Sequence, residues 1–195
     1  MSSKGTPSKS GAKKFLIFGA MFGVVGAMVL VLASGFMVES TNTDEFCVSC
    51  HIMEPFRTSW KVSVHGGKNP QGFTAQCVDC HLPHDGFVNY LVTKARTGMS
   101  DIFHNFTIDG ASFDWAANTD KNRLKFTFDS ACHRCHHNLT PPGISKGGLI
   151  AHRSYLRGEA NKMCAECHMH VGHKNMLQTV EEFYASKKQL NEKEV

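Results

Sequence analysis

The chain has 195 residues and a formal net charge of +4, a length that suggests one compact domain plus whatever its two ends do. The charge is mild and no basic stripe with interleaved aromatic residues is present, so the composition does not indicate a nucleic-acid-binding protein. Histidine is unusually common at 12 residues. That number needs a chemical reason, because histidine is not among the residues that usually fill a core.

The N-terminal segment consists of a basic tail and an apolar span. Residues 1–14 are small, polar and basic, and we expect them to be disordered. Phe15–Val38 carries no charge over 24 residues. As a helix it would extend about 36 Å, enough for a bilayer core of about 30 Å. The alternative is a signal peptide cleaved near Ala33-Ser34-Gly35, but the apolar region of a signal peptide is usually about 7–15 residues. We therefore expect an uncleaved transmembrane anchor.

The charges on either side of this span predict its orientation. They are Lys4, Lys9, Lys13 and Lys14 before it and Glu39, Asp44 and Glu45 after it. The positive-inside rule places the N-terminus in the cytoplasm. Residues from 39 onward would then lie on the periplasmic face of a bacterial inner membrane.

All eight cysteines fall into four Cys-x-x-Cys pairs, and each pair is followed at once by histidine. The motifs are Cys47, Cys50 and His51; Cys77, Cys80 and His81; Cys132, Cys135 and His136; and Cys164, Cys167 and His168. A disulfide framework or two zinc sites of four thiolates would leave the four histidines unexplained. Covalent haem explains them, because two thioethers hold each porphyrin and the next residue supplies an axial imidazole. The sequence predicts four haem c groups.

From Thr41 onward hydrophobic periodicity is weak, as expected where haems rather than side chains form most of the core. The clearest helix is Phe87–Phe106, in which apolar residues recur at three- and four-residue steps. A second helical stretch is expected after Ala151. The predicted fold is mainly α with little regular secondary structure. Its parts are a cytoplasmic basic tail (1–14), a transmembrane anchor (15–38), a periplasmic tetrahaem domain (39–178) and a charged, helix-prone tail (179–195).

Four haems have eight axial positions, of which the motif histidines fill at most four. Because low-spin haem needs two strong ligands, other histidines are candidates. They are His65, His84, His104, His133, His137, His152, His170 and His173. Met53 follows His51 by two residues, and its thioether could also reach an iron, although packing against a porphyrin is the commoner role of methionine.

From the anchor to about Gln178 the chain resembles the NapC/NirT family of membrane-anchored tetrahaem quinol dehydrogenases, and within it the small subunit of cytochrome c nitrite reductase. Besides the single N-terminal span, the resemblance rests on short sequence features. They are Cys47-Val-Ser-Cys50-His51-Ile-Met53, Ser63-Val-His65, Asp79-Cys80-His81-Leu-Pro-His84, Lys94 seven residues before Asp101, and His173 five residues after His168.

This resemblance implies axial ligands. Met53, rather than the adjoining His51, would bind the first iron, and Asp101 would approach its other side. The second and third haems would each have two histidine ligands. At the fourth, either His152 or a lysine of a partner protein would be the distal ligand, and we expect His152. The implied pairs are His81 with His173, His136 with His65, and His168 with His152.

The resemblance also implies a function. The chain would oxidise menaquinol beside the first haem, with Lys94 and Asp101 as the quinol-site residues. It would pass electrons to a periplasmic reductase, expected to be the pentahaem catalytic subunit of cytochrome c nitrite reductase, in a hetero-oligomeric complex. Nitrite would be reduced to ammonia on that partner. The alternatives are a quinol dehydrogenase serving periplasmic nitrate reductase or several reductases, and an electron-storage or sensor cytochrome without quinol activity.

Overall fold

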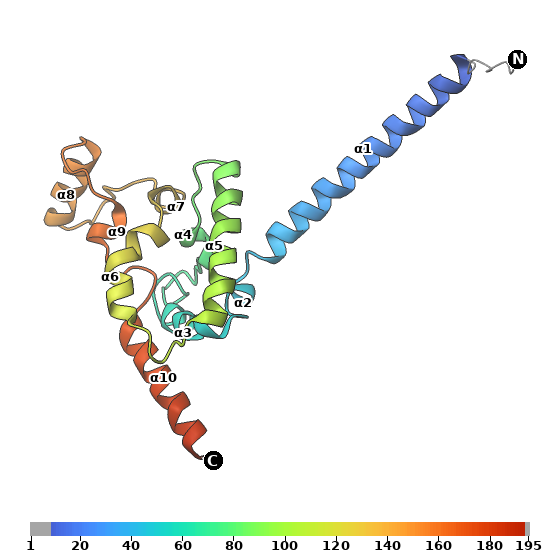
Figure 1. Ribbon diagram of the computed structural model, residues 1–195. Coiled ribbons are helices and arrows are strands. Elements are labelled where there is room, and N and C mark those ends of the chain that lie inside the picture. The colour runs from blue at the N-terminus through green and yellow to red at the C-terminus, as the bar shows by residue number, and fades with distance from the viewer. Residues whose placement is uncertain (1–8, 194–195) are drawn as a thin grey trace, which may run out of the picture. The chain divides into compact units, whose positions relative to one another are not determined.

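The computed structural model describes residues 9–193, which belong to two compact units that divide after Thr41. Regular structure is helical (Figure 1), and within residues 9–193 the only β pairing is an isolated bridge between Gly66 and Thr74. The prediction of a mainly α fold is confirmed.

The first unit is one helix, α1 (Lys9–Ser40), of 32 residues. Its segment Lys13–Ser40 is long and apolar enough to cross a membrane, and the large apolar side chains between Phe15 and Met37 are 58–82% exposed. Such a surface needs a non-aqueous surrounding. The helix begins six residues before Phe15, so the expectation of disorder is wrong for residues 9–14, which continue the helix. Residues 1–8 of the predicted tail lie outside the described residues.

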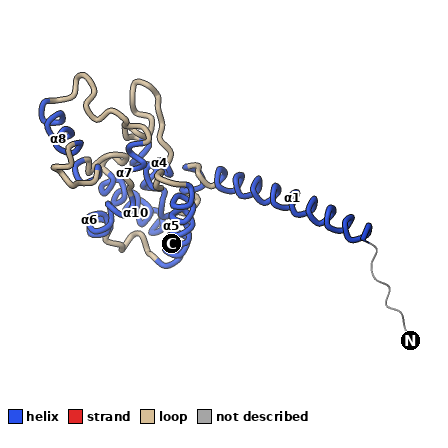
Figure 2. The backbone as a smooth tube through the Cα atoms, turned by 90° about the horizontal axis from the view of Figure 1, so that it is seen from above, coloured by secondary structure: helices blue, strands red, loops and turns tan. Residues whose placement is uncertain are grey.

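The second unit starts at Asn42 and consists of short helices joined by long loops, drawn in blue and tan in Figure 2. They are α2 (Asp44–Cys47), the 3-10 turn η1 (His51–Met53), α3 (Glu54–Lys61), α4 (Cys77–His81), α5 (Phe87–Thr107), α6 (Trp115–Phe126), α7 (Asp129–His133), α8 (Lys146–Leu156), α9 (Cys164–Cys167) and α10 (Met176–Lys193). The helices predicted at residues 87–106 and after Ala151 correspond to α5 and to the second half of α8.

Few apolar side chains of this second unit are buried. Apart from Pro55 and Pro83, those buried in its described part are Ile52, Trp60, Ala75, Leu82, Ala131, Ala165 and Val180. Three of the seven are alanines, which fill little volume. A domain of this size normally has a close-packed interior of large side chains. The small core therefore leaves the interior to other groups, as a multihaem protein requires.

The C-terminal helix α10 packs along α3. Val180 anchors it with 1% of its surface exposed, and the ring of Tyr184 lies so close to Gly110 that no Cβ would fit there. The boundary predicted after Gln178 thus falls within a helix. Residues 179–193 continue from the haem domain, because apolar positions recur among the charged ones that made the segment look like a separate tail.

Candidate haem centres and quinol site

Two of the four haem-attachment motifs lie on one short helix each, whereas the first runs from the end of α2 into η1 and the third from α7 into the turn after it. The second motif forms α4, and the fourth forms α9 with His168 directly after it. Cysteines three residues apart on a helical turn share a face, as attachment to one porphyrin requires. The N-terminus of α4 is fixed by a capping box in which Asp79 accepts a hydrogen bond of 2.9 Å from the backbone of Gln76. Glu166 accepts an equivalent bond of 2.6 Å at α9.

The four motifs adjoin one another in chain order. The thiols of Cys47 and Cys77 lie close enough to shift each other's pKa, and so do those of Cys132 and Cys164. These free thiols stand for thioether sulfurs, which carry no proton once haem is attached. Helix α4 packs on α7 and α7 on α9, which links the second motif to the third and the third to the fourth.

An ion pair of 3.1 Å joins the second and third motifs directly. It connects Asp79 and Arg134, each of which lies between the two cysteines of its motif. Both side chains are partly exposed, so the pair contributes little stability. It does fix the register of the two attachment segments.

Three motif histidines face a second histidine from a distant part of the chain. The ring centroids are 6.2 Å apart for His81 and His173, 6.2 Å for His65 and His136, and 6.0 Å for His152 and His168. A metal lies about 2 Å from each ligating nitrogen, and each nitrogen about 1 Å from its ring centre, so a shared metal requires about 6 Å between centroids. The three pairs therefore fit an iron between their rings.

Hydrogen bonds to the backbone orient several of these rings. The Nδ1 of His81 donates to the carbonyl of Phe126 at 2.6 Å, and that of His152 donates to the carbonyl of Leu139 at 2.5 Å. A ring that donates from Nδ1 keeps the lone pair of Nε2 available for a metal. The carbonyls thus select the ligating tautomer.

His173 has the most extensive support. Its Nδ1 lies 3.1 Å from the carbonyl of Phe56 and 2.9 Å from the hydroxyl of Ser59, which is fully buried. Burial, followed by the nearby charge of His81, lowers the pKa of His173 to about 4. Burial also lowers the pKa of His81. Both rings are therefore neutral at physiological pH, the state in which imidazole binds a metal.

The first motif has different surroundings. His51 is exposed, and it has no ring contact with another histidine among residues 9–193. Met53 is half-buried and directly precedes α3. That Met53, rather than His51, binds the first iron stays a prediction.

Two charged residues of α5, Lys94 and Asp101, lie near this first motif. The pKa of the free Cys47 thiol is lowered to about 7, first by its hydrogen bond to Cys77. Burial opposes that shift, the charge of Lys94 adds to it, and the charge of Asp101 opposes it. The structure thus brings both predicted quinol-site residues within electrostatic reach of Cys47.

Both groups are shifted toward their neutral forms. Burial lowers the pKa of Lys94. The protein around Asp101 removes part of its hydration and raises its pKa, although the side chain keeps access to solvent and His104 acts the opposite way. Groups that titrate nearer neutral pH are suited to proton transfer.

Comparison with known proteins decides the family. The family model for the NapC/NirT cytochrome c family, N-terminal region, matches residues 9–179. The chain belongs to this family. The family predicted from the motifs is confirmed, and its tetraheme c-type members support covalently bound haem c as the cofactor.

Individual relatives cover most of the chain. It is 34% identical over 173 residues to the tetraheme c-type cytochrome CymA of Shewanella oneidensis, covering 81% of this chain and 88% of the relative. It is 35% identical to a tetraheme cytochrome c-type protein of Allochromatium vinosum, covering 84% and 91%. The cytochrome c-type protein NrfH of Wolinella succinogenes is 26% identical, covering 82% and 87%. No solved structure matches.

Some residues at the site of this NapC/NirT protein were missed by sequence reasoning. Asn42 accepts hydrogen bonds from Lys94 Nζ at 2.5 Å and from the hydroxyl of Tyr90 at 2.7 Å. Tyr90 lies one helical turn before Lys94, a spacing that could have indicated it. Asn42 and Ser59 belong to no motif, and only the folded chain brings them to the site. An open cavity of about 410 Å³ adjoins this cluster and is lined in part by Asn42 and Tyr90.

Proposed function

We propose that this chain is a membrane-anchored tetrahaem cytochrome c that oxidises a quinol, with menaquinol as the expected donor, and passes the electrons to a periplasmic reductase. The observation that carries the proposal is an asymmetry. Three motif histidines each face a second histidine, whereas the first motif has Lys94 and Asp101 beside it. One centre thus has groups suited to quinol chemistry, and three have the surroundings of electron-transfer centres.

The chain itself would supply every axial ligand. Met53 would bind the first iron, and its other side would stay free of a strong ligand, with Asp101 nearby. When bound, the haems would supply one-electron carriers whose potentials depend on these ligands. The other ligand pairs would be His81 with His173, His136 with His65, and His168 with His152.

At the quinol site Lys94 and Asp101 would have distinct roles. A quinol must lose two protons as well as two electrons. The Lys94 ammonium, held by Asn42, would donate a hydrogen bond to one quinol oxygen. The Asp101 carboxylate would accept the departing proton, and its raised pKa makes it a better base than an ordinary aspartate. His104, one turn further along α5, could relay that proton to solvent.

The distal ligand of the fourth haem bears on how the chain meets its partner. His152 faces His168 within this chain and has its Nδ1 tied to a carbonyl. With both ligands provided internally, the fourth haem would be complete before any partner binds. A lysine from the partner would be unnecessary.

The expected partner is the pentahaem catalytic subunit of cytochrome c nitrite reductase. The identities do not single out that partner, because CymA of Shewanella oneidensis is more similar to this chain than NrfH is. The second candidate is a quinol dehydrogenase that serves periplasmic nitrate reductase or several reductases. Activity of membranes carrying this chain with each purified reductase distinguishes the two.

The charges around α1 support a cytoplasmic N-terminus in the inner membrane, with the haem domain in the periplasm. The intact mass should equal the full chain plus four haems, apart from loss of Met1. A mass lacking about the first 35 residues would identify a cleaved signal peptide instead.

The test of the function uses the purified, haem-loaded full chain in liposomes. A water-insoluble menaquinol in the bilayer should reduce all four haems, followed by their absorbance. Full reduction by dithionite without any reduction by quinol would contradict the proposal and favour a storage or sensor cytochrome.

A further inference from the structure

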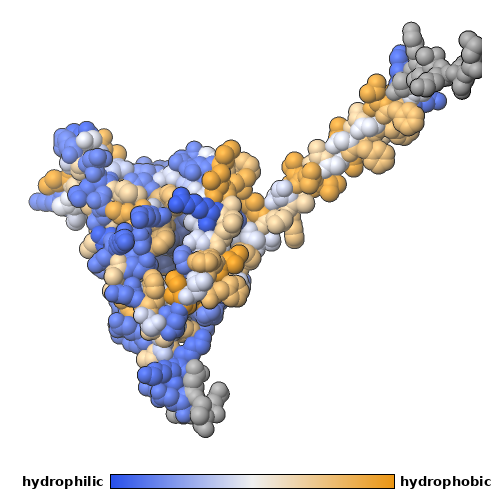
Figure 3. Space-filling view, viewed as in Figure 1, coloured by the Kyte–Doolittle hydropathy of each residue, from blue (hydrophilic) through white to orange (hydrophobic). Residues whose placement is uncertain are grey.

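Helix α5 has two chemically different faces. Lys94 and Tyr90 are directed to Asn42 on one of them. Large apolar side chains line the other over the whole 21-residue helix, each 57–81% exposed. They are Phe87, Val88, Val92, Met99, Ile102, Phe103 and Phe106. Figure 3 shows hydrophobic side chains gathered along the edge of the domain that α5 forms.

An exposed apolar strip of this length indicates a binding surface. Isolated apolar side chains are common on protein surfaces, but a contiguous row is not. In the described part of the chain no other helix packs extensively along α5. The strip would be about 30 Å long, the rise of 21 residues of helix.

The covalent chain indicates what covers this face. Asn42, which holds both Tyr90 and Lys94, follows the last residue of α1 by two positions. Two residues extend at most about 7 Å. With α1 spanning a bilayer, the middle of α5 is therefore tied near the point where the chain leaves the membrane. Arg96, exposed on α5, can reach lipid phosphates beside the strip.

We propose that the apolar face of α5, defined by these seven residues, is inserted in the interface of the phospholipid bilayer that α1 spans. The helix lies in the membrane surface with its apolar side among the upper acyl chains, as interfacial amphipathic helices do. Lipid is the occupant, not a second protein. The inference does not require quinol oxidation.

The experiment uses the haem-loaded full chain in vesicles of phosphatidylethanolamine and phosphatidylglycerol. A phospholipid with a photoreactive diazirine in its acyl chain is included, and labelled peptides are mapped by mass spectrometry. Labels are expected on α1 and on the apolar face of α5. The double variant Val92→Gln with Met99→Gln should lose about tenfold of the α5 label relative to that of α1, because both side chains leave the acyl region.

The matched control changes two exposed apolar side chains of α8, Ile150→Gln with Leu156→Gln. It should leave the α5 label unchanged. Haem absorbance and intact mass show that both variants are folded and loaded. An unlabelled α5 beside a labelled α1 would overturn the proposal. So would protein crosslinks between α5 helices of two copies, which would show that a second chain covers the face.

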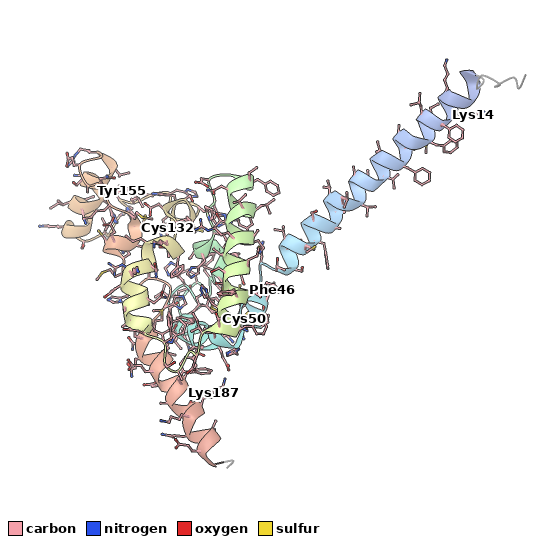
Figure 4. The ribbon with its side chains drawn as sticks, viewed as in Figure 1. Lys14, Phe46, Cys50, Cys132, Tyr155 and Lys187 are labelled. Atoms are coloured by element: carbon pink, nitrogen blue, oxygen red, sulfur yellow. The ribbon has the colours of Figure 1, made fainter. Side chains whose placement is uncertain are left out.

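A second inference concerns α8, which contacts two haem motifs through side chains one turn apart. His152 faces His168 of the fourth motif. Tyr155 stacks on His133 of the third motif, with ring centroids 6.2 Å apart and planes at 21°. The Tyr155 hydroxyl lies 3.2 Å from His133 Nε2. Figure 4 labels Tyr155 and the neighbouring Cys132.

We infer that Tyr155 is a positioning residue that holds α8 against the third motif so that His152 reaches the fourth iron; this rests on the proposed ligand role of His152. The readout is carbon monoxide binding to the reduced protein, which requires the distal ligand to leave. Tyr155→Phe should raise the binding rate at one haem about fivefold, the factor that corresponds to one lost hydrogen bond. Tyr155→Ala, which also removes the stacking, should raise it further.

Arg153→Ala is the control, because Arg153 is an exposed neighbour on the same helix. It should bind carbon monoxide like the parent protein. Parent-like rates in both Tyr155 variants would overturn the inference while leaving the ligand assignment intact. No gain of carbon monoxide binding in His152→Ala would instead remove the ligand assignment, and the role of Tyr155 with it.

Discussion

The first haem motif and the three that follow it have different surroundings. At the second, third and fourth motifs the histidine faces another histidine at 6.0–6.2 Å between centroids. At the first motif His51 is exposed, and the neighbours are the charged side chains of Lys94 and Asp101. The same five-residue motif therefore occurs in two kinds of surroundings, three times with a facing histidine and once beside charged side chains.

The hydrogen bonds around the motifs differ in the same way. Backbone carbonyls of Phe56, Phe126 and Leu139 fix histidine rings near the second and fourth motifs. Near the first motif the polar contacts hold a lysine instead, through Asn42 and Tyr90. Fixed, neutral imidazoles favour rapid electron transfer with little rearrangement, whereas charged groups with shifted pKa values favour proton transfer.

The largest effect that would sharpen this comparison is expected at Asp101. Asp101→Asn keeps the shape but removes the base, so quinol oxidation should fall by roughly 10²–10⁴-fold. Electron transfer from an artificial donor to the reductase should persist, because the three His-paired centres are untouched. Asp120→Asn, an exposed aspartate of α6, serves as the control. A parallel loss of both activities would mean that Asp101 supports the fold.

Lys94→Leu should have the next largest effect. Loss of a charged hydrogen bond to the quinol corresponds to roughly 10–100-fold weaker binding. The change should appear in the KM for quinol more than in kcat. Lys121→Leu on α6 is the matched control. An unchanged KM would place quinol away from this face of α5.

The pH dependence should separate the two regions further. Asp101 accepts a proton only when it is ionised, and its pKa is raised by the loss of hydration. Quinol oxidation should therefore increase with pH up to that raised pKa, by about tenfold per pH unit below it, and level off above it. Oxidation of the reduced haems by the reductase should lack this step. A flat quinol profile from pH 4 to 8 would remove Asp101 as the base.

The smallest effect is expected at Ser59, whose hydroxyl contacts the ring of His173. Ser59→Ala removes one of the two acceptors that share the Nδ1–H of His173 and leaves the Phe56 carbonyl as the other. It should lower the free energy of unfolding by about 1 kcal/mol and shift the potential of one haem slightly. Thr58→Ala, an exposed neighbour, is the control for both calorimetry and redox titration. Equal effects of the two variants would deny Ser59 any specific role.

The features that depend on the spacing of neighbouring residues could be predicted from the sequence. Four Cys-x-x-Cys-His motifs predicted covalent haem, and a 24-residue uncharged segment predicted a span, because each is written in consecutive residues. The helix containing Lys94 and Asp101 was also predictable from its apolar period. Position 101 could be placed on the same face as 94 by helix geometry alone.

Contacts between distant segments were beyond this reasoning. Ser59 meets His173 across 114 positions, and Asn42 meets Lys94 across 52. The backbone carbonyl of Phe126, which accepts from His81, could not be predicted either, because every residue has a backbone carbonyl. The pairing of His65, His152 and His173 was expected only through the family resemblance, since eight spare histidines were available. Spacing could not choose among them.

The most direct test of the central claim is the near-infrared magnetic circular dichroism of the oxidised full chain, which distinguishes haems by their axial ligands. We expect two histidine ligands at the haems of the second, third and fourth motifs, and a methionine ligand and a different spin state at the haem of the first motif. Met53→Leu should change only the signal of the haem on the first motif. Four equivalent bis-histidine haems, or a first haem unaffected by Met53→Leu, would contradict the division between the first motif and the other three.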